Sequence, residues 1–304
     1  MSQNLAAFAG LGSMGRPMAA NIQAKGLLAA VWNRSPGPAE AFSQAHGLPR
    51  ADDPAHLARQ ANILVLCVSA DEDVLAVVDA MLPVLGRDHV VVDCSTVRPE
   101  TARRIAQMLS EVGAGFLDAP VSGGTEGAEQ GSLSMMIGGR CEDLARARPI
   151  LEAMAGRLVH MGPAGSGQAT KAVNQVAVAG VNQAVADAMA LAKSQGLDLD
   201  QVIQALSGGA ADSWFLQKRA PNMRDGVYPL GFRLSLHDKD LAICQSLTEA
   251  MGVRLPIIEM TRLHYRRLIE AGHGDEDVSS LFRLKLEQLE EGEQRGGDDA
   301  EQQQ

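Results

Sequence analysis

The chain has 304 residues, of which 46% are hydrophobic and 21% charged, and its formal net charge is −10 at pH 7. This balance is typical of a soluble globular protein long enough for two domains. The negative charge argues against nucleic acid or an anionic membrane as a partner, so local groups must hold any anionic ligand. No apolar run approaches the roughly eighteen residues that span a bilayer, and the N-terminus does not resemble a signal peptide. We therefore expect a cytoplasmic protein.

The first half of the chain alternates short apolar runs with helical segments. This alternation predicts a parallel sheet covered by helices on both faces. The predicted strands are Leu5–Ala9, Leu28–Asn33, Ile63–Val68, Val90–Asp93, Gly115–Asp118 and Ser134–Gly138. The predicted helices are Met18–Lys25, Pro38–Gln44, Ala70–Met81, Pro99–Glu111 and Glu142–Ala155.

The second half is predicted to be helical. Gln168–Gln195 contains no proline and one glycine, which predicts a single helix of about 27 residues. That helix is apolar on most sides, so we expect a second copy of the chain to help bury it, in a homodimer or homotetramer. Shorter helices are predicted at Leu199–Leu206, Asp238–Met251, Ile257–Ala271 and Val278–Leu289, with Asp238 as a helix cap.

These patterns divide the chain into three predicted parts. Residues 1–163 form a dinucleotide-binding domain, residues 164–290 form a helical domain, and the acidic segment 291–304 is disordered. The four cysteines are far apart without a C-x-x-C motif, and the seven histidines have no metal-ligand spacing. We therefore expect free thiols and no bound metal.

The segment Gly10-Leu11-Gly12-Ser13-Met14-Gly15 has the pattern G-x-G-x-x-G between an apolar strand and a helical stretch. In a dinucleotide site, the first glycine permits the turn, the second lets a pyrophosphate approach the backbone, and the third lets helix and strand pack closely. With 31 glycines in the chain, an ordinary turn is the alternative. The preceding strand and a second strand at the right distance favour the dinucleotide site.

The second predicted strand leads into Asn33-Arg34-Ser35, about twenty residues beyond the glycine loop, where NAD-selective sites carry an acidic residue. Asparagine does not repel a 2′-phosphate, and Arg34 can pair with it or stack on the adenine, while Ser35 can donate a hydrogen bond. We therefore expect NADP(H) to be preferred, with NAD(H) possible. The alternative is that Arg34 points to solvent and the chain uses either cofactor.

Ligands of open α/β sheets bind at the carboxyl ends of the strands. Val68, Ser69 and Thr96 follow two such ends and are expected to line the cofactor site. Ser122-Gly123-Gly124 offers a hydroxyl and unobstructed backbone N–H groups, which suit a carboxylate, although a loop without a ligand is the alternative.

Lys171 and Asn174 are three residues apart and share a face of the long predicted helix. A dehydrogenase needs a group that exchanges the proton of the alcohol, and a desolvated lysine can do this. The alternative is an ordinary lysine on the exposed stripe of the helix.

Five segments of the chain occur in the order found in the β-hydroxyacid dehydrogenases: Gly10–Asn21, Asp93–Thr96, Asp118–Ala128, Gly165–Asn174 and Lys239-Asp240. The chain therefore resembles this family, which includes 3-hydroxyisobutyrate dehydrogenase, tartronate semialdehyde reductase and glyoxylate/succinic semialdehyde reductase. The resemblance covers roughly residues 5–285. It implies a Rossmann-type N-terminal domain and an all-α C-terminal domain like that of 6-phosphogluconate dehydrogenase, joined by the long helix, with the active site in the cleft. It also implies reversible NAD(P)-dependent oxidation of a small β-hydroxy acid to its aldehyde acid.

The resemblance also implies residue roles. Lys171 matches the catalytic lysine, and Asn174 the asparagine that binds substrate and positions that lysine. Ser122, Gly123 and Gly124 match the loop that binds the substrate carboxylate. The remaining matches are Thr96 beside the nicotinamide, Lys239 at the cofactor, and Asp240 and Phe232 at the substrate. The chain departs from the family at Asp187, where many members carry glutamate.

Other readings of the same fold are weaker. A 6-phosphogluconate dehydrogenase needs a larger helical domain, and imine reductases usually replace the lysine that is present here as Lys171. An inactive scaffold would lose the lysine, the asparagine and the glycine loop, which this chain keeps. The motif around Lys171 and Phe232 leans towards semialdehyde reductases, and oxidation of 3-hydroxyisobutyrate or a serine-type substrate is the alternative. Trp214, Phe215 and Phe232 are expected to line the part of the pocket that selects the substrate.

Overall fold

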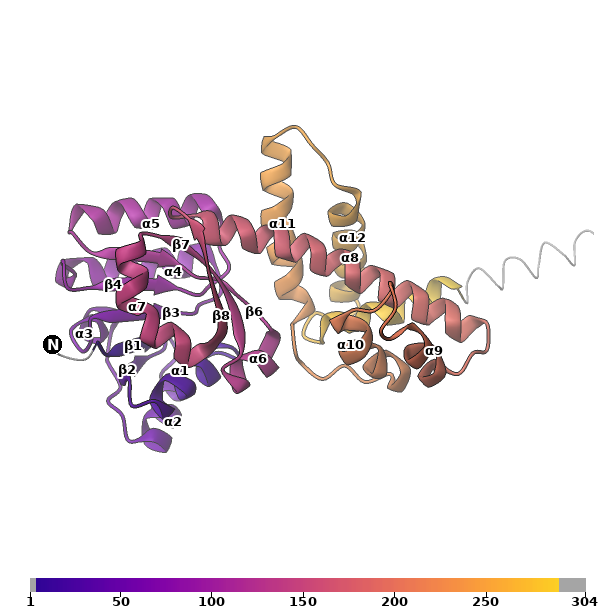
Figure 1. Cartoon of the computed structure of the whole chain (residues 1–304), viewed down its shortest axis with the longest axis horizontal. Helices are drawn as coiled ribbons and strands as arrows, with labels where there is room; N and C mark the ends of the chain where they lie inside the picture. Colours follow the sequence, from indigo (N-terminus) through magenta and orange to yellow (C-terminus); the bar gives the residue numbers. More distant parts are fainter. Residues whose placement is uncertain (1–3, 290–304) are drawn as a thin grey trace, which may run out of the picture. The chain divides into compact units, whose positions relative to one another are not determined.

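The computed structural model describes residues 4–289 (Figure 1). The predicted tail, residues 291–304, lies outside the described part of the chain. The chain divides into two compact units after Lys171. The predicted division after residue 163 lies eight residues earlier, just before the long helix, and stays a prediction.

The first unit is built on one mixed sheet. Among residues 4–289, eight strands contribute to it in the order β2–β1–β3–β4–β5–β7–β6, with β8 beside β7. The strands β1 to β5 pair in parallel, whereas β7 runs antiparallel to β5 and to β6. The strands are β1 (Ala6–Ala9), β2 (Leu28–Trp32), β3 (Ile63–Leu66), β4 (Val90–Asp93), β5 (Gly115–Asp118), β6 (Val121–Ser122), β7 (Leu133–Gly139) and β8 (Ala155–Gly162).

Helices cover both faces of this sheet, as predicted (Figure 1). Successive residues of a strand point to opposite faces, so Phe8 and Val65 enter one core while Ala7 and Leu64 enter the other. The first core packs on α1, α2 and α7, and the second packs on α3, α4 and α5. The helices are α1 (Gly15–Ala24), α2 (Pro36–His46), α3 (Pro54–Ala58), α4 (Asp71–Met81), α5 (Pro99–Glu111), α6 (Gly124–Gln130) and α7 (Cys141–Met154).

The predicted parallel sheet is confirmed for β1 to β5, and β7 adds antiparallel pairs beyond β5. After Ala119 and Pro120, β6 runs in the same direction as β5, because both strands are antiparallel to β7. Only residues 123–132, which include α6, lie between β6 and β7, and a parallel connection needs a crossover of a dozen residues or more. The chain therefore stays at the same end of the sheet and returns along β7. The elements α3, α6, α10, β6 and β8 were not predicted, and α1 begins three residues earlier than predicted.

The second unit is helical. It contains most of α8, followed by α9 (Leu199–Leu206), α10 (Trp214–Asp225), α11 (Leu234–Ala250), α12 (Pro256–Glu270), a 3-10 turn η2 (Val278–Ser280) and a helix over residues 281–289. These helices bury a core that includes Met189, Leu241 and Phe282. Asp187 forms an ion pair with Lys285 at 2.8 Å, so the shorter carboxylate still has a partner.

Helix α8 spans Ser166–Ser194 and is 29 residues long, slightly longer than predicted. Val173 and Leu191 are 70% and 56% exposed in the single chain. The expectation that a second copy covers this helix stays a prediction. None of the described helices is both long enough and apolar enough to cross a membrane.

The predicted capping role of Asp238 is wrong. Helix α11 begins four residues earlier than expected, at Leu234, with Arg233 as its N-cap. Asp238 instead lies in the second turn and accepts a hydrogen bond from Arg262 Nε at 3.1 Å.

Candidate functional site

The glycine loop between β1 and α1 has three glycines with different roles. Gly10 has φ +98°, and a Cβ built on it would lie 2.1 Å from the Cys67 carbonyl oxygen. A Cβ on Gly15 would lie 1.9 Å from the Gly10 carbonyl oxygen. A Cβ on Gly12 would meet nothing within 4 Å. Gly10 and Gly15 are therefore required by the fold, whereas Gly12 leaves room for a ligand to reach the backbone.

This loop fits the pyrophosphate of a dinucleotide. Helix α1 begins at Gly15, directly after the loop, and its N-cap residue Met14 makes no side-chain capping hydrogen bond. Methionine has no oxygen with which to cap, and the N–H groups of a first helical turn favour an anion. Leu11, Ser13 and Met14 line the same turn.

Asn33 supports the loop from the end of β2. Its Oδ1 accepts a hydrogen bond from Leu11 N–H at 2.8 Å, and its Nδ2 donates to the Ser35 carbonyl at 2.9 Å. Both bonds fix the side-chain amide of Asn33 against the loop. Arg34 is ion-paired with Asp73 of α4 while its own side chain is 78% exposed. Asp73 was not predicted at this site, because nothing in the residue spacing links α4 to the end of β2.

The ends of β3 and β4 are joined by Ser95. Its hydroxyl accepts a hydrogen bond from Val68 N–H at 2.9 Å, and its own N–H donates to Asp93 Oδ1 at 3.0 Å. Asp93 is fully buried, and its Oδ2 has no hydrogen-bond partner among the described residues. This desolvation raises the pKa of Asp93 to about 7 from its ordinary value of 3.8. Thr96 and Ser69 are accessible beside these buried groups.

Lys171 lies near the start of α8, within the first unit. It is only 7% exposed, and its Nζ donates a hydrogen bond to the Val121 carbonyl at 2.8 Å. The next residues are Ser122, Gly123 and Gly124, which link β6 to α6 with φ values of +135° and +63° at the two glycines. The structure therefore brings the predicted lysine and the predicted carboxylate loop together, with Gly124 already the first residue of α6.

A network of hydrogen bonds and an ion pair includes three predicted residues of the second unit, Asn174, Lys239 and Asp240. Asn174 Nδ2 donates to Gln175 Oε1 at 2.9 Å, and Gln175 Nε2 donates to Asp240 Oδ2 at 2.6 Å. Asp240 is also ion-paired with Lys239, at 3.1 Å. The Phe232 ring lies 5.1 Å from the ring of the buried His237. Gln175 and His237 were not predicted, since a lone glutamine or histidine on a helix carries no distinctive signal.

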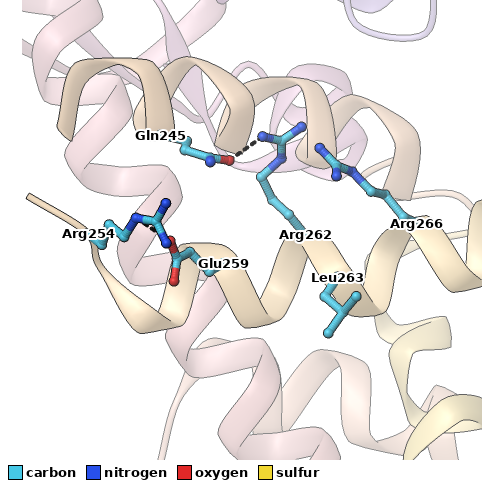
Figure 2. Close-up of a pocket in the computed structure, with 6 residues that line it drawn as sticks. All are labelled: Gln245, Arg254, Glu259, Arg262, Leu263 and Arg266. Atoms are coloured by element: carbon cyan, nitrogen blue, oxygen red, sulfur yellow. Dashed lines mark hydrogen bonds and ion pairs between the residues drawn. The ribbon is translucent and has the colours of Figure 1, made fainter. Parts of the chain in front are cut away.

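A separate cavity of about 360 Å³ lies between α11 and α12 (Figure 2). It contains none of the predicted site residues. Arg254 pairs there with Glu259, and Arg262 donates to the Gln245 side chain. The whole lining is Gln245, Arg254, Glu259, Arg262, Leu263 and Arg266. No group of three or more candidate metal-ligating residues occurs in the described part of the chain.

Comparison with known proteins adds two family matches. Residues 6–162 match the NAD binding domain of 6-phosphogluconate dehydrogenase, and residues 165–285 match the NAD-binding family of NADP-dependent 3-hydroxyisobutyrate dehydrogenase.

Individual relatives cover almost the whole chain. The chain is 34% identical to a 3-hydroxyisobutyrate dehydrogenase of Pseudomonas aeruginosa, covering 91% of this chain and 97% of that protein. It is 33% identical to an NAD-dependent L-serine dehydrogenase of the same organism, covering 91% and 96% respectively. The solved structure of Mycobacterium tuberculosis 3-hydroxyisobutyrate dehydrogenase with L-serine is similar at a TM-score of 0.84 and 30% identity, covering 93% of this chain and 99% of that one.

Two glycine substitutions separate folding from ligand binding. We predict that Gly12→Ala melts near the wild-type temperature but binds dinucleotide at least about tenfold more weakly, because its Cβ occupies ligand space. Gly15→Ala should lower the melting temperature by several degrees, because its Cβ meets the Gly10 carbonyl. Thermal scans and fluorescence titration measure both effects. Unchanged dinucleotide affinity in Gly12→Ala would contradict the assignment.

The buried Asp93 predicts a pH-dependent stability. Its folded-state pKa is raised, so the folded protein holds this proton more tightly and loses stability as the pH rises from about 4 to about 7. The neutral amide of an asparagine resembles the protonated acid. Asp93→Asn should therefore increase the free energy of unfolding at pH 8 by up to about 4 kcal/mol, and much less at pH 4.

Urea unfolding at both pH values tests this prediction, and Asp79→Asn on the exposed face of α4 is the matched control. A stability gain that is the same at pH 4 and pH 8, or equal in the two variants, would contradict it.

Proposed function

Because the chain belongs to the β-hydroxyacid dehydrogenase family, we propose that it interconverts a small β-hydroxy acid and its aldehyde acid, with Lys171 as the general acid/base. The observation that carries this proposal is the buried amine of Lys171 beside the Ser122–Gly124 loop. Both belong to the unit that carries the dinucleotide loop.

Different residues of this unit bind the cofactor and the substrate carboxylate. The accessible backbone at Gly12 and the start of α1 would hold the pyrophosphate of the nicotinamide cofactor. A nicotinamide dinucleotide held there would supply the hydride chemistry. Ser122 and the backbone of Gly123 and Gly124 hold the substrate carboxylate. This places the neighbouring hydroxyl carbon within reach of Lys171.

Lys171 then moves the proton. In oxidation its neutral amine accepts the hydroxyl proton as the C–H bond breaks, and in reduction its ammonium form returns a proton to the carbonyl oxygen. Val121 supports this role, because its carbonyl accepts one N–H of the lysine and fixes the direction of the amine. Asn174, one turn further along α8, orients the substrate and the lysine.

The substrate is a short hydroxy acid or aldehyde acid. Relatives named as 3-hydroxyisobutyrate dehydrogenase and L-serine dehydrogenase favour those two acids as the first compounds to test. Phe232 supports the reduction of short semialdehydes as the first candidate reaction. Oxidation of a serine-type substrate is the second candidate. A panel of both classes with both cofactors discriminates between them.

The cofactor is NADP(H) in preference to NAD(H). Arg34 supports this choice, because it follows β2 and leaves its guanidinium exposed for a 2′-phosphate. Asp73 opposes it, since the carboxylate must release Arg34 and lie near the incoming phosphate. The preference is therefore a balance between these two side chains.

The first test of the function is Lys171→Ala. We expect kcat to fall at least about 100-fold, the usual loss for a general acid/base, with cofactor affinity changed less than about twofold. Lys193→Ala, an exposed lysine of the same helix, is the control and should keep wild-type turnover. Asn174→Ala should also slow turnover, and the double variant should lose less than the product of the single losses, because both act on one group. Near-normal turnover of Lys171→Ala would overturn the proposal.

The cofactor preference is tested at Arg34. We expect kcat/KM to favour NADPH at least about tenfold, equivalent to about 1.4 kcal/mol, and Arg34→Ala to weaken NADPH far more than NADH. Asp73→Asn should strengthen NADPH binding several-fold and leave NADH unchanged, because it removes only a charge near the phosphate. Arg104→Ala on the exposed face of α5 is the control. If Arg34→Ala lowers kcat/KM equally with NADPH and NADH, Arg34 contacts only the adenine, and the predicted preference is wrong.

A further inference from the structure

Gln168 is a buried side chain in the first turn of α8 that has no part in the reaction described above. It is 1% exposed, and both ends of its amide are bonded to the segment after β4. Its Oε1 accepts a hydrogen bond from Val97 N–H at 3.2 Å, and its Nε2 donates to the Ser95 carbonyl at 2.8 Å. These two backbone groups flank Thr96. One side-chain amide therefore fixes the backbone on both sides of Thr96, as a neighbouring strand would.

The backbone of Gln168 is held by Asp118, at the end of β5. Asp118 Oδ2 accepts a hydrogen bond from Gln168 N–H at 2.9 Å, and its Oδ1 accepts one from Gly165 N–H at 2.8 Å. The carboxylate thus satisfies N–H groups at the start of α8 that have no partner within the helix.

Close packing prevents this first turn from sliding. A Cβ on Gly167 would lie 2.4 Å from the Met136 carbonyl and 2.9 Å from Asp118 Oδ2. A Cβ on Gly138 would lie 2.4 Å from Asp118 Oδ1. The start of α8 can therefore pack against β5 and β7 in only one position.

Lys171 follows Gln168 by three residues and lies on the same side of the helix. An α-helix transmits the position of its first turn rigidly to the next. The contacts of Gln168 and Asp118 consequently fix where the Lys171 amine stands relative to Thr96 and to the Val121 carbonyl.

We propose that Gln168, whose backbone is held by Asp118, is a positioning residue. It fixes the position of the Lys171 amine relative to the segment around Thr96. The inference rests on the proposed role of Lys171. Lys171 must exchange a proton with the substrate oxygen while hydride transfer would occur at the adjacent carbon. The amine on α8 and the cofactor-facing Thr96 segment after β4 must therefore both be correctly placed around one substrate. Misplacement by about 1 Å can cost such a reaction about 100-fold in rate.

Two variants of Gln168 test the proposal. Gln168→Met keeps the length of the side chain and removes both hydrogen bonds, so kcat should fall about 10- to 100-fold while cofactor affinity changes less than about threefold. Gln168→Glu in its protonated form can still accept from Val97 N–H and donate to the Ser95 carbonyl, whereas its ionised form cannot donate. The turnover of Gln168→Glu relative to wild type should therefore rise as the pH is lowered.

A second readout needs neither cofactor nor substrate. In amide hydrogen exchange, Gln168→Met should exchange at least about tenfold faster over residues 95–97 and 165–171. Gln183→Met is the matched control, since Gln183 is also a buried glutamine of α8, bonded to Thr261 and His264. It should leave both the exchange of those segments and kcat at wild-type levels.

The outcomes separate this inference from the proposed function. Turnover retained by Lys171→Ala overturns the proposed function, whatever Gln168 does. If Lys171→Ala is inactive but Gln168→Met keeps the wild-type kcat and exchange rates, only the positioning role is wrong. Equal losses of kcat in Gln168→Met and Gln183→Met, without pH-dependent recovery in Gln168→Glu, also overturn it.

Discussion

The arrangement of the candidate site depends on one buried carboxylate at the start of a helix. Asp118 is fully buried, and burial raises its pKa, while hydrogen bonds from the backbone of Gly165 and Gln168 oppose that rise. A buried charge without such donors would be costly, and a helix start without an acceptor would leave its N–H groups unsatisfied. Each group therefore compensates for the other. The consequence is a fixed origin for α8, from which Lys171 follows one turn later.

The same logic explains why the site lies at the carboxyl edge of the sheet. The parallel strands end there in residues whose polar groups bind other strand ends rather than solvent, as Ser95 does with Val68 and Asp93. Asp93 is left with one unpartnered oxygen in the described structure, next to a segment expected to face the cofactor. A carboxyl group with a pKa near neutrality makes the stability of this edge depend on pH.

Much of the first unit was predictable from the sequence, because its signals are local. The segments Val90–Asp93, Pro99–Glu111 and Gly115–Asp118 have the predicted bounds, since apolar runs and a proline-led helix define their ends. Helix α6 was missed because glycines are poor helix formers. Gly123 and Gly124, at its N-terminal end, instead suggested a loop.

The unpredicted parts depend on contacts between distant residues. Gln168 meets Ser95 and Val97 across more than seventy positions, and Arg34 meets Asp73 across 39. No periodicity or motif encodes such pairs. In the second unit, Asn174 and Asp240 were expected to contact substrate, and both are hydrogen-bonded to the unpredicted Gln175. Family resemblance locates Asn174 and Asp240, but only the fold shows which side chain holds them.

The most direct measurement is a crystal structure of the protein with NADPH and a short β-hydroxy acid. The account predicts the carboxylate of the acid at Ser122, Gly123 and Gly124, with the β-hydroxyl oxygen within about 3.2 Å of Lys171 Nζ. It also predicts that Gln168 keeps both bonds to the Thr96 segment. A carboxylate bound elsewhere, such as the arginine-lined cavity between α11 and α12, or a Lys171 amine turned away from the hydroxyl, would contradict it.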